Sequence, residues 1–127
     1  MKVRHLDARG KGKYLYDYDN DIANFKVKDK EYLKSIDFDN FIIDIDTKGY
    51  IIGIRIFDVS KIFKIDKIAL KKMLNWEFNS RIEDNVLTFQ LRFTCMLRNK
   101  QIVTQGEDFV RDAIDWNIKD SKVNCTA

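Results

Sequence analysis

The residues best suited to chemistry in this sequence are six aspartates in two groups. Asp17, Asp19 and Asp21 form the first group and have the D-x-D-x-D spacing that opens a calcium-binding loop. An EF-hand loop then requires glycine at its sixth position and glutamate at its twelfth, where this chain has Ile22 and Lys28. The EF-hand is therefore excluded. A surface cation site stays open, and turn-forming aspartates are the alternative that we favour.

The second group consists of Asp37, Asp44 and Asp46. If residues 35–46 form a hairpin, these carboxylates share one face, because alternate residues of a strand point the same way. Such a group could hold a cation or act in acid–base chemistry. The alternative is a solvated polar sheet face, because nothing in the sequence indicates the burial that shifts a carboxylate pKa. We assign no catalytic residue and expect no cofactor, so the six aspartates are candidates for a metal site only.

Basic residues gather in two segments, and either segment could contact nucleic acid. Residues 1–13 have a net charge of +4 and the whole chain has +3, so residues 14–127 sum to −1. A frayed, solubilising tail and a solvated helix face are the alternatives. The candidates for phosphate contacts are Lys2, Arg4, Arg9, Lys11 and Lys13 in the tail and Lys64, Lys67 and Lys71 in a predicted helix.

The sequence contains few of the residues that other classes of catalytic site require. The chain has one histidine, His5, and two cysteines, Cys95 and Cys125. These are too few for a four-ligand zinc site, and the sequence contains no P-loop and no G-x-G-x-x-G motif. No apolar run approaches the ~20 residues of a membrane-spanning helix or the ~7 of a signal peptide. We therefore expect a soluble, cytoplasmic protein with reduced thiols and no membrane contact.

Alternating apolar residues predict strands over most of the chain. The clearest alternation runs from Leu87 to Leu97. Asp39-Asn40 is suited to a two-residue hairpin turn that pairs Ile36 with Ile43. The glycine at position 53, inside a strand pattern, predicts a bulge or a closely neighbouring backbone.

Residues 61–75 have a helical period instead, with a break expected near Asp66 and with Ser60 and Asp66 as candidate N-caps. The predicted fold class is mostly β, at the margin of α+β: an antiparallel β-meander of about eight strands with one helix or broken helix near residues 60–75. We expect a flexible basic tail over residues 1–13 and a single β-rich domain over 14–127. Within that domain, residues 14–60 form the meander, 61–75 the helix and 76–127 a second antiparallel region.

Two stretches of the chain resemble a known family. Residues 16–25 read Y-D-Y-D-N-D-I-A-N-F, against a family pattern of Y-D-x-E-x-D-x-L-Y-I, with Asp19, Ala23 and Asn24 as departures. Residues 41–60 follow V-I-V-D-x-D-x-x-G-x-V-V-G-I-E-I-L-x-A-S without a gap, with Arg55 in place of an acidic residue. The chain thus resembles the small prokaryotic domain of unknown function 2283, and its later part is similar to the longer, mostly archaeal members. The resemblance implies a β-meander domain without an established activity, and a partner-binding role.

These observations favour a non-enzymatic protein-interaction or homo-oligomerising module, with exposed strand edges as the docking surface. Nucleic-acid binding through the basic tail and the helix lysines is the first alternative. A cation-dependent enzyme that uses the clustered aspartates is the second.

Overall fold

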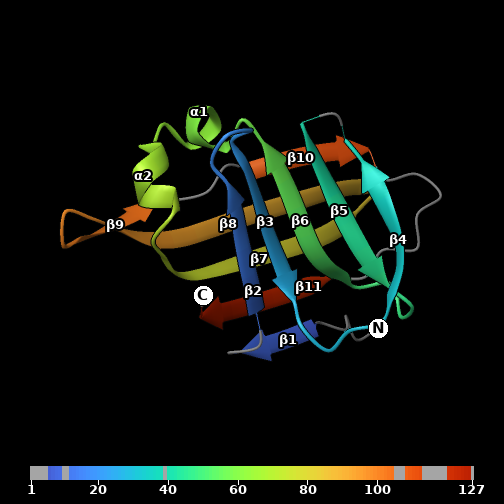
Figure 1. Ribbon diagram of the computed structural model, residues 1–127. Helices are drawn as coiled ribbons and strands as arrows, with labels where there is room; N and C mark the ends of the chain where they lie inside the picture. The colour runs from blue at the N-terminus through green and yellow to red at the C-terminus, as the bar shows by residue number, and fades with distance from the viewer. Residues whose placement is uncertain (1–5, 10–11, 39, 105–107, 113–119, 127) are drawn as a thin grey trace.

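The computed structural model describes residues 6–9, 12–38, 40–104, 108–112 and 120–126, and it has two β-sheets packed face to face (Figure 1). One sheet has the order β2-β3-β6-β5-β4, and the other has the order β1-β11-β7-β8-β10 with β9 also paired to β8. The strands are β1 (Leu6–Arg9), β2 (Gly12–Asp17), β3 (Ile22–Val27), β4 (Tyr32–Asp37), β5 (Phe41–Asp46), β6 (Ile51–Phe57), β7 (Met73–Glu83), β8 (Val86–Leu97), β9 (Lys100–Thr104), β10 (Asp108–Asp112) and β11 (Ser121–Thr126).

The five-stranded sheet is built from hairpins, but it is not a simple meander. The β4–β5 turn closes as expected, because the Phe38 N–H donates to the Phe41 carbonyl at 2.8 Å and Ile36 pairs with Ile43. The predicted meander order is wrong at β3, whose second neighbour is β6 rather than β4. The β4–β5 hairpin lies outside β6, so β6 returns between β3 and β5 and joins the two hairpins into one sheet.

The six-stranded sheet is built around the long β7–β8 hairpin. Its turn residues Asp84 and Asn85 both have positive φ, 52° and 61°, as two-residue hairpin turns of the primed types require. Strand β8 confirms the predicted strand over residues 87–97. Strand β1 pairs with β11 in parallel, so this sheet is not purely antiparallel.

Aromatic side chains fill the space between the two sheets, whose strands cross steeply (Figure 1). Phe25 of β3 contacts Trp76 of β7 with ring centroids 5.4 Å apart. Phe41 of β5 contacts Phe109 of β10 at 4.7 Å. Because each pair joins one sheet to the other, the two sheets share one core.

The helices α1 (Val59–Phe63) and α2 (Lys67–Leu70) connect β6 to β7. They confirm the broken helix: Lys64 has φ 52°, and the Asp66 side chain caps α2 by accepting from the Ile68 N–H at 2.9 Å. The predicted extent to residue 75 is wrong, because the chain enters β7 at Met73. Ser60 is not an N-cap, since α1 begins after Asp58. Neither helix among the described residues could cross a membrane.

The expected tail over residues 1–13 is too long. Residues 6–9 form β1 and residues 12–13 begin β2, because their backbones pair with β11 and β3. Residues 1–5 and 10–11 lie outside the described part of the chain. The mostly β fold class is confirmed, with short strands such as β1, β9 and β10 raising the number of strands above the expected eight or so.

Candidate functional site

Asp21 is one of two predicted metal-site residues that are buried in the fold. It is 7% exposed. Its carboxylate accepts hydrogen bonds from the Tyr16 hydroxyl and the Ser60 hydroxyl, both at 2.6 Å, and from the Ser60 N–H at 3.2 Å. Burial alone would raise the pKa of Asp21, but the hydrogen bonds from Ser60 and Tyr16 outweigh it and the pKa is lowered. Asp21 therefore ties the β2–β3 turn to the start of α1.

The other two aspartates of the first group do not join Asp21 around a common point. The Asp17 carboxylate accepts from the Asn20 side chain at 2.8 Å and from the Asn20 N–H at 3.1 Å, and these bonds lower the pKa of Asp17. Asp19 is exposed in the same turn. Among the described residues, no three His, Cys, Asp or Glu side chains are placed to hold a metal ion.

The three aspartates of the second group also have separate positions and partners. Asp46 is 4% exposed, and its Oδ1 accepts from the Lys48 and Tyr50 N–H groups at 2.9 Å, which shapes the β5–β6 turn. Asp44 accepts from the Ser35 hydroxyl at 2.6 Å. Asp37 lies on β4, paired with residue 42 rather than with either of the other aspartates.

The structure brings part of the predicted basic set against the first aspartate group. The ammonium groups of Lys67 and Lys71 lie 4.4 and 4.6 Å from the ring centroid of Tyr18, which stands in the β2–β3 turn. Lys64 is exposed between the helices, and Lys13 is exposed on β2. Arg9 belongs to β1, and Lys2, Arg4 and Lys11 lie outside the described residues. The Tyr18 ring thus already contacts two cations of its own chain.

The outer face of the five-stranded sheet, the face turned away from the core, carries a feature that sequence reasoning missed. Strand register places one apolar residue from each of four adjacent strands on this face, and we call the set the apolar band. Two members pair directly on β3 and β6, and the other two lie in the next row on β2 and β5, with Asn24 and Arg55 between them. Leu15 is 54% exposed and the other members are partly exposed. No described helix or strand lies over this face (Figure 1). The apolar band consists of Leu15 of β2, Ile22 of β3, Phe57 of β6 and Ile42 of β5.

Charged residues flank the apolar band in one row across the same four strands. Lys13 pairs with Lys26, Lys26 with Gly53, and Gly53 with Asp44. The row is basic on β2 and β3 and acidic on β5. Strand alternation predicts which side chains point away from the core. Their alignment across the sheet depends on the order of the strands, which the sequence did not reveal.

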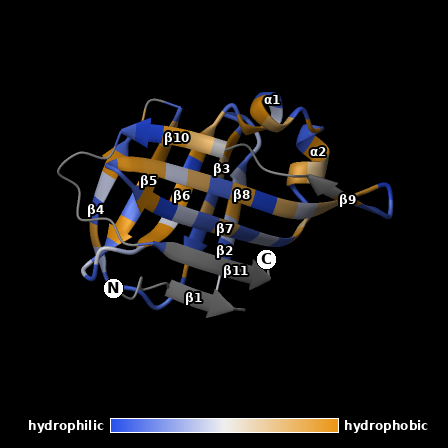
Figure 2. Cartoon of the chain, turned by 180° about the vertical axis from the view of Figure 1, so that it is seen from behind, coloured by the Kyte–Doolittle hydropathy of each residue, from blue (hydrophilic) through white to orange (hydrophobic). Residues whose placement is uncertain are grey.

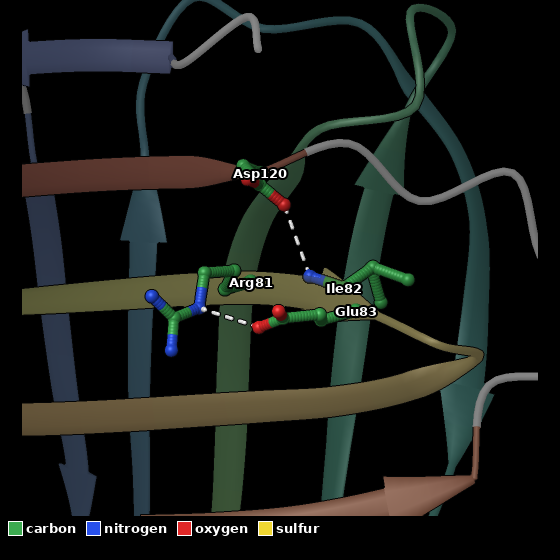
Figure 3. A network of polar contacts seen from close by, with 4 residues as sticks. All are labelled: Arg81, Ile82, Glu83 and Asp120. Atoms are coloured by element: carbon green, nitrogen blue, oxygen red, sulfur yellow. Dashed lines mark hydrogen bonds and ion pairs between the residues drawn. The ribbon is translucent and has the colours of Figure 1, made fainter.

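Along β7 and β8, the outer face of the six-stranded sheet is polar by comparison. Hydrophilic and hydrophobic residues alternate along β7 and β8 (Figure 2), and the outward residues of β8 include Thr88, Arg92 and Thr94. Figure 3 shows the far end of β7, where Arg81 Nε lies 3.8 Å from a Glu83 carboxylate oxygen. In the same view the Ile82 N–H donates to the Asp120 carboxylate at 3.0 Å.

Cys95 is a free, buried thiol of β8, and burial raises its pKa to about 11. A thiol with such a pKa has almost no thiolate near neutral pH, so Cys95 is a packing residue.

The described geometry defines a two-sheet β domain whose motif residues are hydrogen-bonded within the fold. A family model described as "Protein of unknown function (DUF2283)" matches residues 13–60. A relative of similar length, an uncharacterized protein of Methanocaldococcus jannaschii, is 31% identical over 97 residues, covering 76% of this chain and 84% of that protein. The chain belongs to the DUF2283 family, as its two motif stretches indicated.

A second relative comes from Methanosarcina mazei and carries the name "Putative hypoxanthine phosphoribosyltransferase". It is 32% identical over 96 residues, which cover 76% of this chain and 77% of that protein. No solved structure matches the chain significantly.

Proposed function

We propose that this chain is a non-enzymatic protein-interaction module that docks through the outer face of its five-stranded sheet. The observation that carries the proposal is the apolar band, which crosses four strands and is left uncovered by any described element. Apolar side chains grouped on a face and flanked by charges are typical of protein interfaces.

The family motifs support this reading, because their polar residues stabilise the fold. Tyr16 and Ser60 both donate to the Asp21 carboxylate, and Asp46 accepts the N–H groups that shape a turn. A reaction centre would instead direct such groups toward a common point where a substrate could lie. A cation-dependent enzyme therefore ranks last among the three candidates.

The name of the Methanosarcina mazei relative raises phosphoribosyl transfer as a further activity. Such a transfer releases pyrophosphate, a polyanion usually bound by backbone N–H groups at a helix N-terminus or in a glycine-rich loop. The described helices of this chain have only five and four residues. The two-sheet architecture offers little support for that chemistry.

Nucleic-acid binding ranks second. Lys64 and Lys71 are exposed, which favours contact with phosphates. However, base stacking requires an accessible aromatic face, and Lys67 and Lys71 already lie over the Tyr18 ring. Asp17, Asp19 and Asp66 are also exposed at this end of the molecule and would repel a phosphate backbone.

Site-specific photocrosslinking in the native cells tests the docking face. A benzophenone side chain at Leu15 probes the outer face of the five-stranded sheet, and the matched control at Val110 probes β10 of the other sheet. The two positions are similarly accessible to a crosslinking partner, because Leu15 is 54% exposed and Val110 is 52% exposed. We expect a discrete protein adduct from position 15 and none from position 110. No adduct from position 15, or the same adducts from both positions, would overturn the proposal.

A further inference from the structure

We propose that the partner on the outer face of the five-stranded sheet is a second copy of this chain, packed face to face about a twofold axis that runs between β3 and β6. The inference rests on the proposed function, because it names the occupant of the same face. The strand order and the residue register given above determine which groups such a symmetry brings together.

A twofold axis parallel to the strands places β3 over the partner's β6 and β2 over the partner's β5. Each cross-strand row then lies at the same height along the strands in both copies. In the middle row, Leu15 of one copy then lies over the partner's Ile42. In the next row, Ile22 lies over the partner's Phe57. All four members of the apolar band therefore meet apolar groups, although no residue of the band meets itself.

The charged row is self-complementary about the same axis. Lys13 of one copy lies over the partner's Asp44, and the symmetry repeats this contact. Within one copy Lys13 and Lys26 are directly opposed across β2 and β3, an arrangement in which like charges destabilise a sheet. A second copy would place a carboxylate against this pair of lysines.

Two further pairs of positions are compatible with this packing. Lys26 lies over the partner's Gly53, where the absence of a side chain leaves room beside Asp44: a Cβ on Gly53 would lie 3.2 Å from the Asp44 carboxylate. Arg55 lies over the partner's Asn24, so the two arginines do not face each other. An axis centred on β6 itself would put Arg55 against its own copy, which is why the axis between β3 and β6 is favoured.

The proposed contact involves only four short strands, so we expect a reversible dimer with a dissociation constant in the micromolar range. Facing sheets pack about 10 Å apart with their strands rotated by about 30°. The contacts named above therefore state which strands of the two copies face each other. Long side chains such as those of lysine can span the displacement that the rotation introduces.

Charge exchange at the Lys13–Asp44 contact tests the dimer by sedimentation velocity over a concentration series. We expect the wild type to associate and Lys13→Asp and Asp44→Lys each to weaken association at least tenfold, because each change places like charges in contact. An equimolar mixture of the two variants should restore association as a heterodimer, because both contacts then join opposite charges. Thr88→Glu, on the outer face of the other sheet, should leave association unchanged. Circular dichroism and thermal melts verify that each variant is folded.

The outcomes separate this inference from the function on which it rests. A wild type that stays monomeric at every attainable concentration, or a mixture that fails to associate, would overturn the dimer. If position 15 then still crosslinks to a different protein, the docking face stands without the second copy. An adduct with the mass of two copies of this chain supports both.

Discussion

Asp21 joins two segments of the chain that are far apart in the sequence. Its two carboxylate oxygens accept bonds from Tyr16 and Ser60, and its own carbonyl accepts from the Val59 N–H at 3.2 Å. Asp21 also has φ 56°, a left-handed conformation that aspartate tolerates better than most residues. The sequence indicated turn chemistry at this position, but Ser60 lies 39 residues away and no local pattern could reveal that contact.

We expect Asp21→Asn to lower the free energy of unfolding by about 1–3 kcal/mol. The amide keeps one acceptor but presents an N–H₂ group to donors that now bond a carboxylate. Urea denaturation at neutral pH measures the loss. Asp19→Asn, in the same turn but exposed, is the control and should change stability by less than about 0.5 kcal/mol. Equal stability of the two variants would contradict the role assigned to Asp21.

Acid titration of stability tests the same contact independently. The folded-state pKa of Asp21 is lowered, so its contribution to stability is fully present above the unfolded pKa of about 3.9 and is lost as the pH falls through the folded value. Between about pH 5 and pH 2 the wild type should therefore lose more stability than Asp21→Asn. Parallel stability curves for the two proteins would contradict the lowered pKa.

Gly53 shows how one residue sets the distance between elements. A Cβ at this position would lie 3.1 Å from the Phe25 carbonyl of β3 and 3.2 Å from the Asp44 carboxylate of β5. The β5–β6 register also shifts between Asp44 and Ile45. Both findings confirm the close backbone and bulge predicted from a glycine in mid-strand.

We expect Gly53→Ala to destabilise the fold by about 1 kcal/mol, because the strain of overpacking exceeds the entropy gained from a less flexible unfolded chain. Chemical denaturation measures the change. The added Asp44→Ala should recover part of the loss, since it removes the movable half of the clash and leaves the Phe25 carbonyl. A Gly53→Ala protein more stable than the wild type would show that the sheet relaxes without strain.

The helix region marks the limit of prediction from period and propensity. The break at Asp66 could be predicted because its side chain caps the following turn locally. The end of the helix could not, because β7 begins at Met73, which pairs with Cys95 of β8. Tyr14 of β2 also binds this region through a 2.7 Å hydrogen bond to the Leu70 carbonyl, and that partner is 56 residues distant.

At the scale of the whole molecule, alternation predicted most strands but not their arrangement. Alternation shows which side chains share a face of a strand, and it is silent about which strand lies beside it. The insertion of β6 between β3 and β5 aligns the apolar band and its charged row. The candidate interaction surface therefore became visible only with the register, whereas the aspartates and lysines singled out by sequence proved to be divided among several local contacts.

The shared aromatic core predicts that both sheets unfold together. Phe25 is fully buried, and its ring lies 5.4 Å from Trp76 and 6.2 Å from Phe93, both on the opposite sheet. Phe25→Leu should cost roughly 1–3 kcal/mol, because a smaller side chain leaves a void between the sheets. Phe57→Leu, on the outer face of β6, should cost less when measured at concentrations where the chain is monomeric.

Amide hydrogen exchange shows whether the loss of stability is shared by both sheets or confined to one. Because the Phe25 ring contacts both sheets, Phe25→Leu should lower the free energy of opening equally for β3 and β6 in one sheet and for β7 and β8 in the other. Trp76 fluorescence in a Trp116→Phe background and far-ultraviolet circular dichroism should then report the same denaturation midpoint. Loss of protection confined to β3 and β6 would instead mean that the sheets open separately, and that the packing of Phe25 against Trp76 contributes little to joining them.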